Sequence, residues 1–400
     1  MERRPIVIAG AGPGGAATAL ALHRLDPRLA GEIVVLEKAR HPRPKVCAGG
    51  LIPAGRAWME KHDITFDLPH VAVHRARAYT PRAVVEHVEK NFCYIIRRNE
   101  LDAHLVRACR ERGIEVREQE PILHLCRDAG GVRIETERET YTASIVVGAD
   151  GSGSLVRRTL ISSSRATMAR ATMCEIAAAG GWDGHAQHRS DFDFTDVARG
   201  LAGYRWSFPC VIDGAPHVNT GVYSLGRGGR RIQAALESEI ARHGATTARR
   251  VAFPIHWYRR HVTRVAAENV LLVGDAAGAD PLMGEGISLA LEYGSMAAGN
   301  AVAALRSGDL SGGSYQAEVD DSWLGIKLGR LHSLAGWIYG RWSRPCFAVP
   351  EHSARLRALG LRWYNGIDDW DRRSLTDAAW HLCQPGFASP RGGQGGGSQT

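Results

Sequence analysis

Short, continuous apolar runs near the start of the chain are separated by a longer stretch of helical character. The runs at 5–9 and 32–37 are typical of strands buried on both faces, and the Ala/Leu-rich stretch at 16–24 has the length of a helix. The same buried-strand pattern returns at 144–147 and 270–273, each time followed by a Gly-rich turn. We therefore expect one parallel sheet whose strands come from separate parts of the chain.

A different pattern lies between these strands. Residues 71–95 alternate apolar and polar positions, as half-buried antiparallel strands do, and 165–260 holds short apolar runs between turn residues. Both segments predict an antiparallel-sheet domain inserted into the first domain. The expected organisation is a discontinuous first domain over 1–70, 96–164 and 265–310, an inserted domain over 71–95 and 165–264, a C-terminal helical region over 311–388, and a disordered Gly/Ser/Gln tail over 389–400.

Composition narrows the class of protein. The chain has 400 residues, 44% of them hydrophobic, and no apolar run long enough to predict a transmembrane helix. Its net charge of +8 is spread without long blocks, which fits a solvated surface or a basic face for an anionic cofactor, redox partner or membrane. The eight cysteines form no CxxC pair, so we expect reduced thiols and a cytoplasmic location. Metal-ligand spacing and nucleic-acid motifs are both absent from the sequence.

The first candidate site is a phosphate-binding turn. Gly10-Ala-Gly12-Pro-Gly-Gly15 fits GxGxxG between a strand and a helix, and the helix that continues from Ala16 directs backbone amides at a pyrophosphate. Glu37 ends the second strand, where a carboxylate accepts hydrogen bonds from both ribose hydroxyls and repels a 2′-phosphate. This arrangement favours FAD or NAD over NADP.

Two further motifs follow buried strands. One is Gly148-Ala-Asp150-Gly151, and the other is Gly274-Asp275 with its continuation to Gly286-Ile287. Strand-to-turn placement puts each of them at the carboxyl edge of the sheet, where ligands bind. Asp275 is placed to bind a ribityl chain, and the amides of Gly286 and Ile287 to face a flavin pyrimidine ring. We therefore predict an α/β protein, α+β overall, with a Rossmann-like FAD-binding domain of the glutathione-reductase type.

The motif set resembles the para-hydroxybenzoate hydroxylase superfamily and, within it, the geranylgeranyl reductase family. Lys45-Val-Cys47-Ala48-Gly49-Gly50 resembles the family's Lys-x-Cys-Gly-Gly loop, and Arg98-Asn-Glu-Leu-Asp102 its Arg-x-x-Phe-Asp helix start. The segments from Gly203 to Pro209 and from Val218 to Val222 resemble its Tyr-x-Trp-x-Phe-Pro strand and the strand after it. The resemblance spans about residues 6–300. It departs from the family in the extra Ala48 and in a shorter turn after Gly278.

The resemblance implies roles for single residues. Beside FAD it places Lys45, Cys47, Ala48, Gly50, Arg98 and Ile122. Around the substrate it places Cys47 and three aromatic residues, Tyr204, Trp206 and Phe208. Their alternation along one strand agrees with an apolar wall, although ordinary sheet core and an inert buried thiol explain the same pattern.

The expected function is reduction of carbon–carbon double bonds in an isoprenoid-like substrate by reduced FAD. The substrate would be an apolar small molecule or a lipid, with peripheral membrane contact as an option, and electrons would come from NAD(P)H or a reduced redox protein. Two alternatives stay open at this stage. One is a flavin monooxygenase or halogenase, because halogenases carry a similar Trp-x-Trp-x-Ile-Pro segment. The other is a flavoprotein with a non-catalytic or protein-modifying role, such as the maturation of a partner protein.

Overall fold

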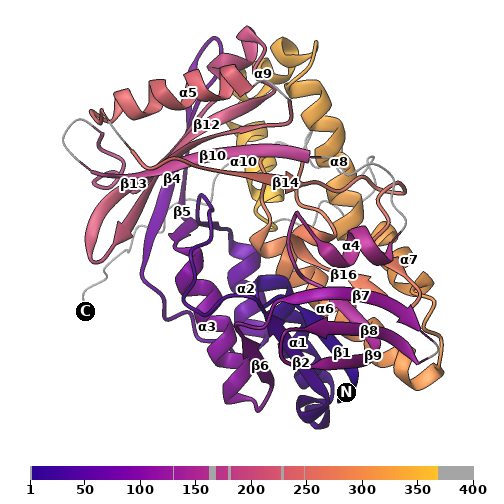
Figure 1. The fold of residues 1–400 in the computed structure, drawn as a ribbon. Coiled ribbons are helices and arrows are strands. Elements are labelled where there is room, and N and C mark those ends of the chain that lie inside the picture. Colours follow the sequence, from indigo (N-terminus) through magenta and orange to yellow (C-terminus); the bar gives the residue numbers. More distant parts are fainter. Residues whose placement is uncertain are drawn as a thin grey trace, which may run out of the picture.

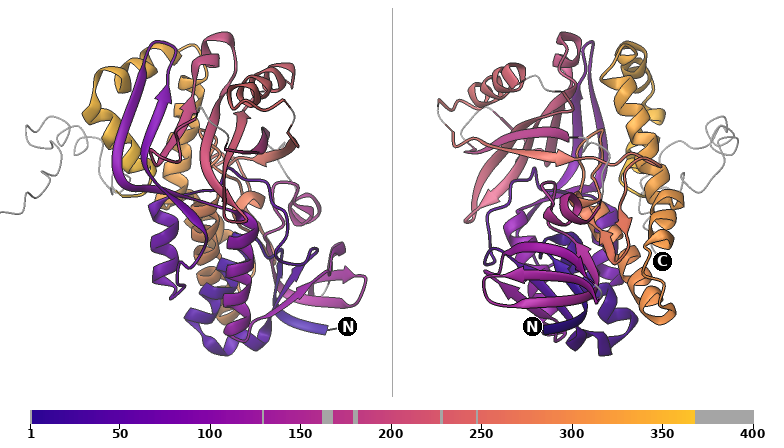
Figure 2. Two further views of the ribbon diagram at one scale, coloured as in Figure 1. Left: turned by 90° about the vertical axis from the view of Figure 1, so that its left-hand side faces the viewer. Right: turned by 45° about the vertical axis from the view of Figure 1, so that its right-hand side comes forward.

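The computed structural model describes residues 2–128, 130–161, 168–178, 182–226, 229–246 and 248–367. These residues form two sheets, one above the other in Figure 1, and a column of C-terminal helices along one side (Figure 2). This architecture confirms the predicted fold class.

The lower sheet is parallel at its centre. Its order is β15-β16-β9-β1-β2-β6, and a hairpin of β7 and β8 continues antiparallel from β9. The strands are β1 (Glu2–Ala9), β2 (Ile33–Glu37), β6 (Glu115–Glu118), β7 (Ile122–Asp128), β8 (Gly131–Thr136), β9 (Thr140–Gly148), β15 (Ala266–Ala267) and β16 (Val270–Leu272). Because β1, β2, β9 and β16 run in one direction, their carboxyl ends lie at the same edge of the sheet.

Helices cover this sheet. Those that pack on it are α1 (Pro13–Leu25), α3 (Arg98–Glu111), α4 (Leu155–Leu160) and α6 (Ile287–Ser307), with short 3-10 turns η1 (Pro27–Glu32) and η3 (Gly274–Ala276), and α2 (Pro53–Lys61) packs on α6. The helices α1 and α6 approach so closely that a Cβ on Gly294 would lie 2.7 Å from the Cβ of Ala17. Glycine at this position therefore lets the two helices come together over the carboxyl edge.

The upper sheet has the order β14-β10-β13-β12-β11-β4-β5-β3. All its neighbours pair antiparallel except β11 and β4, which are parallel. The strands are β3 (Gly50–Leu51), β4 (His70–Tyr79), β5 (Val84–Ile96), β10 (Met168–Ala177), β11 (Arg189–Asp193), β12 (Gly203–Ile212), β13 (Ala215–Ser224) and β14 (Val251–His256), and the 3-10 turn η2 (Thr195–Arg199) follows β11. The domain boundaries stay a prediction, and β3, inside 1–70, already pairs with this upper sheet.

One helix lies within the segment 165–260, for which the sequence pattern predicts a strand-rich domain. Helix α5 (Gly229–Arg242) covers the outer face of the upper sheet. It buries Ile232, Leu236 and Ile240 against Cys174 and Val222 of the strands beneath. The spacing of these apolar residues, four apart, is helical, so the signal was present but was hidden among strand-like runs.

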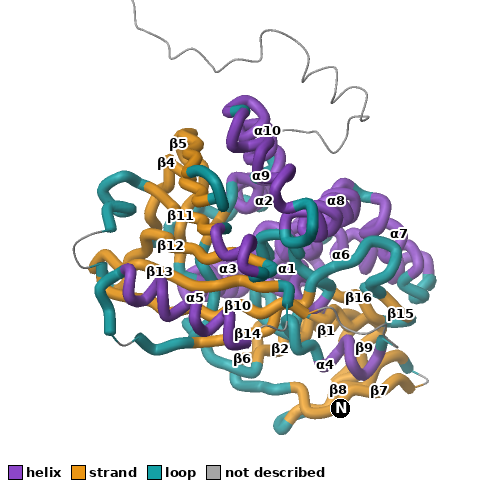
Figure 3. The backbone as a smooth tube through the Cα atoms, turned by 90° about the horizontal axis from the view of Figure 1, so that it is seen from above, coloured by secondary structure: helices purple, strands orange, loops and turns teal. Residues whose placement is uncertain are grey.

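The C-terminal region is helical where it is described. It comprises α7 (Gly313–Asp321), α8 (Trp323–Ile338), α9 (Ser343–His352) and α10 (Ala354–Tyr364). Seen from above, α9 and α10 lie beside the β4–β5 hairpin (Figure 3). Among the described residues, no helix is both long and apolar enough to cross a membrane. The predicted helical residues after 367 and the predicted disordered tail, 389–400, lie outside the described residues.

Candidate flavin and substrate site

The GxGxxG turn joins β1 to α1 at the carboxyl edge. A Cβ on Gly10, whose φ is 108°, would lie 2.5 Å from the carbonyl oxygen of Ala149, and a Cβ on Gly15 would lie 1.9 Å from the oxygen of Gly10. Both positions therefore require glycine for backbone packing. Gly12 differs, since its Cβ would meet only the guanidinium groups of Arg43 at 3.6 Å and Arg98 at 4.0 Å.

The helix that follows offers an anion site. No side chain caps the N-terminus of α1 and no acidic residue lies in its first turn, so the positive end of the helix faces the turn. Ala16 is buried and donates its amide to the oxygen of Gly12, as the first turn of the helix requires. The two arginines opposite Gly12 add positive charge, which suits a pyrophosphate.

Glu37 lies at the next position along the edge. Its carboxylate is buried and accepts hydrogen bonds from the amides of Ala11 and Ala39, each at 3.0 Å. Arg43 lies 3.5 Å from Glu37 and 3.3 Å from Asp102, which in turn holds Arg98 at 2.8 Å. Burial is the largest single effect and lowers the pKa of Arg98, but the charge and the hydrogen bond of Asp102, together with the nearby Cys47 and Asp275, raise the pKa overall, so Arg98 stays a fixed cation.

Two aspartates complete the edge in different ways. Asp150 caps α4, because its Oδ2 accepts from the amides of Leu155 at 2.6 Å and Val156 at 3.1 Å. Asp275 accepts from the Ser152 hydroxyl at 3.4 Å and lies beside Gly286, whose Cβ would lie 3.1 Å from its Oδ1. The two predicted residues thus share an edge, but only Asp275 faces the cavity described below.

The loop between residues 280 and 286 is held by four tyrosines. Tyr204 donates its hydroxyl to the backbone oxygen of residue 283 at 2.7 Å, and Tyr223 to that of residue 281 at 2.8 Å. Tyr339 donates to the backbone oxygen of residue 282 at 2.7 Å, and Tyr364 to the carboxylate of Asp280 at 2.9 Å. These tyrosines come from the upper sheet and from the C-terminal helices. Opposite elements therefore fix the loop that leads to Gly286 and Ile287.

The Cys47 loop is tied to the aromatic strand by one side chain. Asn219 is buried, donates to the carbonyl oxygen of Cys47 at 3.0 Å and accepts from the indole of Trp206 at 2.9 Å. The Cys47 thiol also accepts from the amide of Gly49 at 3.3 Å. Asn219 lies in the segment from Val218 to Val222, whose sequence pattern does not indicate this role.

An apolar cavity of about 660 Å³ lies between these parts. Its floor is the Cys47 loop and the 282–287 loop, one wall is the inner face of the upper sheet, and another is formed by α8, α9 and α10. Predicted residues that line it are Lys45, Cys47, Ala48, Gly50, Arg98, Tyr204, Trp206, Phe208, Asp275, Gly286 and Ile287. The predicted residues that do not line it are Gly10, Gly12, Gly15, Ala16, Glu37, Ile122 and Asp150.

This division separates two regions of the structure. The residues outside the cavity, apart from Ile122, belong to the turns at the carboxyl edge, and those lining it belong to the Cys47 loop, to β12 and to the segment from Asp275 to Ile287, with Arg98 at the start of α3. Ile122 begins β7, pairs with Thr136 and packs against the core of the lower sheet. Among the described residues, no cluster of side chains could hold a metal ion.

Comparison with known proteins decides the family. The chain matches the family described as "FAD binding domain" over residues 3–309. It belongs to this family of FAD-dependent oxidoreductases. FAD fits the residues present in this oxidoreductase, because Arg43 Nε and Asp150 Oδ1 are buried without hydrogen-bond partners in the described part of the chain, and the turn at Gly12 leaves room for phosphates.

Named relatives of this oxidoreductase include reductases. It is 27% identical to menaquinone reductase of Mycolicibacterium smegmatis, over 74% of this chain and 76% of the relative. It is also 27% identical to digeranylgeranylglycerophospholipid reductase 3 of Methanosphaera stadtmanae, over 84% of this chain and 86% of the relative.

Solved structures share the fold at lower identity. A geranylgeranyl bacteriochlorophyll reductase-like protein of Thermoplasma acidophilum has a TM-score of 0.70 and 22% identity, covering 85% of this chain and 88% of its own. The flavin-dependent brominase Bmp2 has a TM-score of 0.69 and 14% identity, covering 95% and 98%. Both reductase-like and halogenating enzymes therefore use this architecture.

Proposed function

We propose that the protein saturates carbon–carbon double bonds of an isoprenoid or similar apolar substrate. The cavity carries this proposal, because it is lined almost wholly by apolar side chains and reaches from the expected flavin end to the C-terminal helices. Burying each CH₂ group contributes about 0.8 kcal/mol, so a chain of isoprene units gains most of its affinity from such walls. The lipid reductases among the relatives support this choice of substrate.

When bound, FAD supplies the hydride for one carbon of the double bond. The residues of this chain then orient the alkene and exclude water. Trp206 and Phe208 form the flat wall, and Gly221 allows it, because a Cβ there would lie 2.4 Å from the Trp206 ring. Cys47 lies across the cavity floor, where Asn219 fixes its backbone.

The second carbon needs a proton, and Glu285 is placed to hold it. The hydroxyl groups of Tyr204, Tyr223 and Tyr364, which also line the cavity, already donate to the 280–283 segment. Glu285 lines the cavity next to Gly286, with one carboxyl oxygen accepting from the amide of Ser288 at 2.8 Å. Burial raises the pKa of Glu285, which favours the protonated form that a general acid requires.

Oxygenation or halogenation is the second candidate. It is supported by the brominase architecture and by the segment Tyr204-Arg-Trp-Ser-Phe-Pro209. The Cys47 loop, which resembles the reductase branch, favours reduction instead. We also propose a cytoplasmic location, which is supported by the seven described cysteines, all of them free thiols. The electrons would come from NAD(P)H or from a reduced redox protein.

One experiment separates the two reactions. Photoreduced protein is mixed without oxygen with a geranylgeranyl lipid, and flavin absorbance and product mass are followed. Reduction predicts flavin reoxidation and a mass gain of about two hydrogens, whereas oxygenation predicts no anaerobic reaction and a long-lived adduct absorbance after mixing with oxygen. Trp206→Leu should retain FAD and lose turnover. A variant that loses flavin and activity together would remove Trp206 from the substrate wall.

A further inference from the structure

The cavity opens to the surface between the C-terminal helices. Trp337 of α8, Val349 of α9 and Leu356 of α10 all line the cavity, yet their exposed fractions are 52%, 50% and 37%. We take these side chains, which both line the cavity and are exposed, to mark the place where the cavity opens. Trp342, between α8 and α9, is exposed to 52% as well. Large apolar side chains in this number are unusual on a surface unless something covers them.

The same segment carries most of the net positive charge. Residues 323–364 contain seven lysines and arginines and one acidic residue, a net +6 out of the chain's +8. The single acid, Glu351, accepts a hydrogen bond from Thr80 at the tip of the β4–β5 hairpin. Arg341 and Arg344 are exposed, and the Arg341 guanidinium lies 5.4 Å from the centre of the Trp342 ring.

We propose that this docking face, formed by Trp337, Trp342, Val349 and Leu356 with Arg341 and Arg344, binds an anionic lipid bilayer. Tryptophan and arginine side chains favour the membrane interface, where the ring enters the headgroup region and the cation meets lipid phosphate. The cavity mouth then opens onto the bilayer. An apolar substrate would then pass from the bilayer into the cavity without crossing water. The identity of that substrate rests on the proposed function.

The charge distribution argues against a second copy of the chain as occupant. Two such faces would bring Arg341 and Arg344 of one copy against the same two arginines of the other, with no acidic residue in either face. An acidic protein would meet the charge but would also close the mouth that an apolar substrate has to pass. A bilayer satisfies the charge, the tryptophans and the opening together.

The test is cosedimentation of the full-length, FAD-loaded protein with vesicles. Vesicles of phosphatidylcholine alone are compared with vesicles that also contain phosphatidylglycerol, at low and high salt. We expect binding to the anionic vesicles and release by salt, because the interaction with exposed charges is screened. The double variant Arg341→Glu/Arg344→Glu should bind at least about tenfold more weakly, and Trp337→Ser/Trp342→Ser should also lose binding.

Matched controls lie on the lower half of the molecule. Leu123 on β7 is exposed to 56%, and Arg306 near the end of α6 is exposed as well. Leu123→Ser and Arg306→Glu should bind vesicles like the unchanged protein. FAD content and melting curves establish that each variant is folded, and the arginine pair decides the matter if the tryptophan pair does not fold.

Several results would overturn the proposal. These are equal binding to neutral and anionic vesicles, unchanged binding by both double variants, or no binding at all. In the last case, light scattering that shows a dimer broken by the variants would assign the face to a second copy. A monomer whose Trp337 and Trp342 resist chemical modification would assign it to residues 368–400. Vesicle binding needs no turnover, so docking without alkene reduction would refute the proposed function and leave the docking face intact.

Discussion

At the scale of single residues, Glu285 gives the site a specific dependence on pH. Because burial raises its pKa, the carboxyl group is protonated up to a higher pH than usual, and its ability to give a proton is lost as the pH rises through that value. We expect Glu285→Gln to lower kcat by about a hundredfold or more and to remove this alkaline decline. FAD content should not change.

The measurement is kcat against pH with a prenyl lipid, together with the solvent isotope effect. Glu285→Asp should restore part of the decline, because it returns an acid to the same loop. If Glu285→Gln keeps the original profile, the proton comes from elsewhere and Glu285 only caps α6.

Asn219 predicts a second residue-level effect. Replacing it with leucine leaves the Trp206 indole and the Cys47 carbonyl without their partner, which costs about 1–3 kcal/mol for each buried group. Modification of Cys47 by a thiol reagent, followed by mass spectrometry, should become faster in Asn219→Leu. The control is Asn300→Leu on α6, which should leave Cys47 unchanged. Equal Cys47 reactivity in both variants would show that Asn219 does not hold the loop.

The sequence predicts some of these residues for a clear reason. Gly10, Gly12 and Gly15 lie in one turn between a strand and a helix, so their spacing in that local context predicts them. Arg43 acts by contacts with Glu37 and Asp102, which lie on different elements, and nothing local distinguishes it from Arg40 three residues earlier. Roles that depend on partners distant in sequence appear only when the chain is folded.

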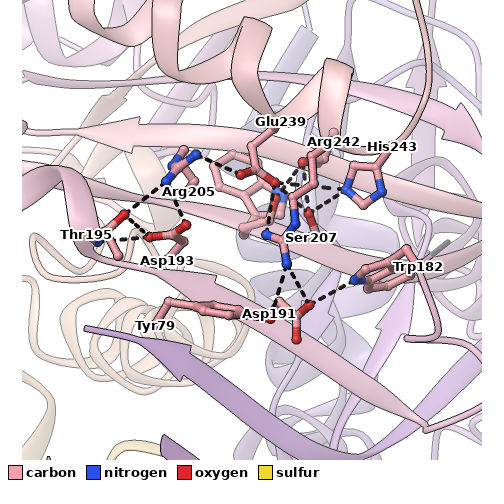
Figure 4. Close-up of polar contacts among 12 residues, drawn as sticks. Tyr79, Trp182, Asp191, Asp193, Thr195, Arg205, Ser207, Glu239, Arg242 and His243 are labelled. Carbon is pink, nitrogen blue, oxygen red and sulfur yellow. Dashed lines mark hydrogen bonds and ion pairs between the residues drawn. The ribbon is translucent and has the colours of Figure 1, made fainter. Parts of the chain in front are cut away.

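At the scale of elements, α5 makes the upper sheet sensitive to acid. His243 follows α5 and is buried, with its ring nitrogen 2.8 Å from the Ser207 hydroxyl, while Glu239 accepts from the same hydroxyl at 3.0 Å (Figure 4). Burial lowers the pKa of His243 from 6.5 to about 4. The unfolded chain therefore binds more protons between these values, and stability is lost as the pH falls through this window.

We expect His243→Gln to flatten this dependence. The shift corresponds to about 3 kcal/mol between roughly pH 6.5 and 4, an order-of-magnitude figure for one buried group. Urea unfolding of both proteins at the two ends of the window measures it. Curves that fall in parallel would mean that other groups, not His243, cause the acid sensitivity.

The strands differ in how clearly their sequence pattern shows which residues are buried. The strands β2 and β16 are buried throughout, as are the final four residues of β1 and of β9, and these buried stretches are the continuous apolar runs that the sequence shows. In β12, the aromatic residues face the cavity, while Arg205 and Ser207 face Glu239 of α5 on the other side of the sheet (Figure 4). A polar face covered by a helix has the same alternation as a polar face open to solvent, so the strand pattern does not reveal α5.

For the molecule as a whole, the C-terminal helices are part of the site. The sequence indicated helices rich in aromatics, but not their place, because their partners are a cavity and a loop rather than a repeating pattern. Tyr339 and Tyr364 bind the 280–283 segment from that side. We expect Tyr339→Phe/Tyr364→Phe to bind FAD about three- to tenfold more weakly. Tyr79→Phe, on β4, is the matched control, and unchanged flavin affinity in the double variant would contradict the coupling.

The coupling between flavin binding and helix packing through the hydroxyl groups of Tyr339 and Tyr364 is reciprocal. If the helices strengthen flavin binding, flavin must strengthen the packing of the helices by the same free energy. Protein stripped of its cofactor should then be cut by protease within α8–α10 sooner than in the lower sheet, and adding FAD should restore the protection. Bound flavin would thus stabilise the helices around the cavity mouth by the same free energy, about 0.6–1.4 kcal/mol, through the 280–283 segment that both contact.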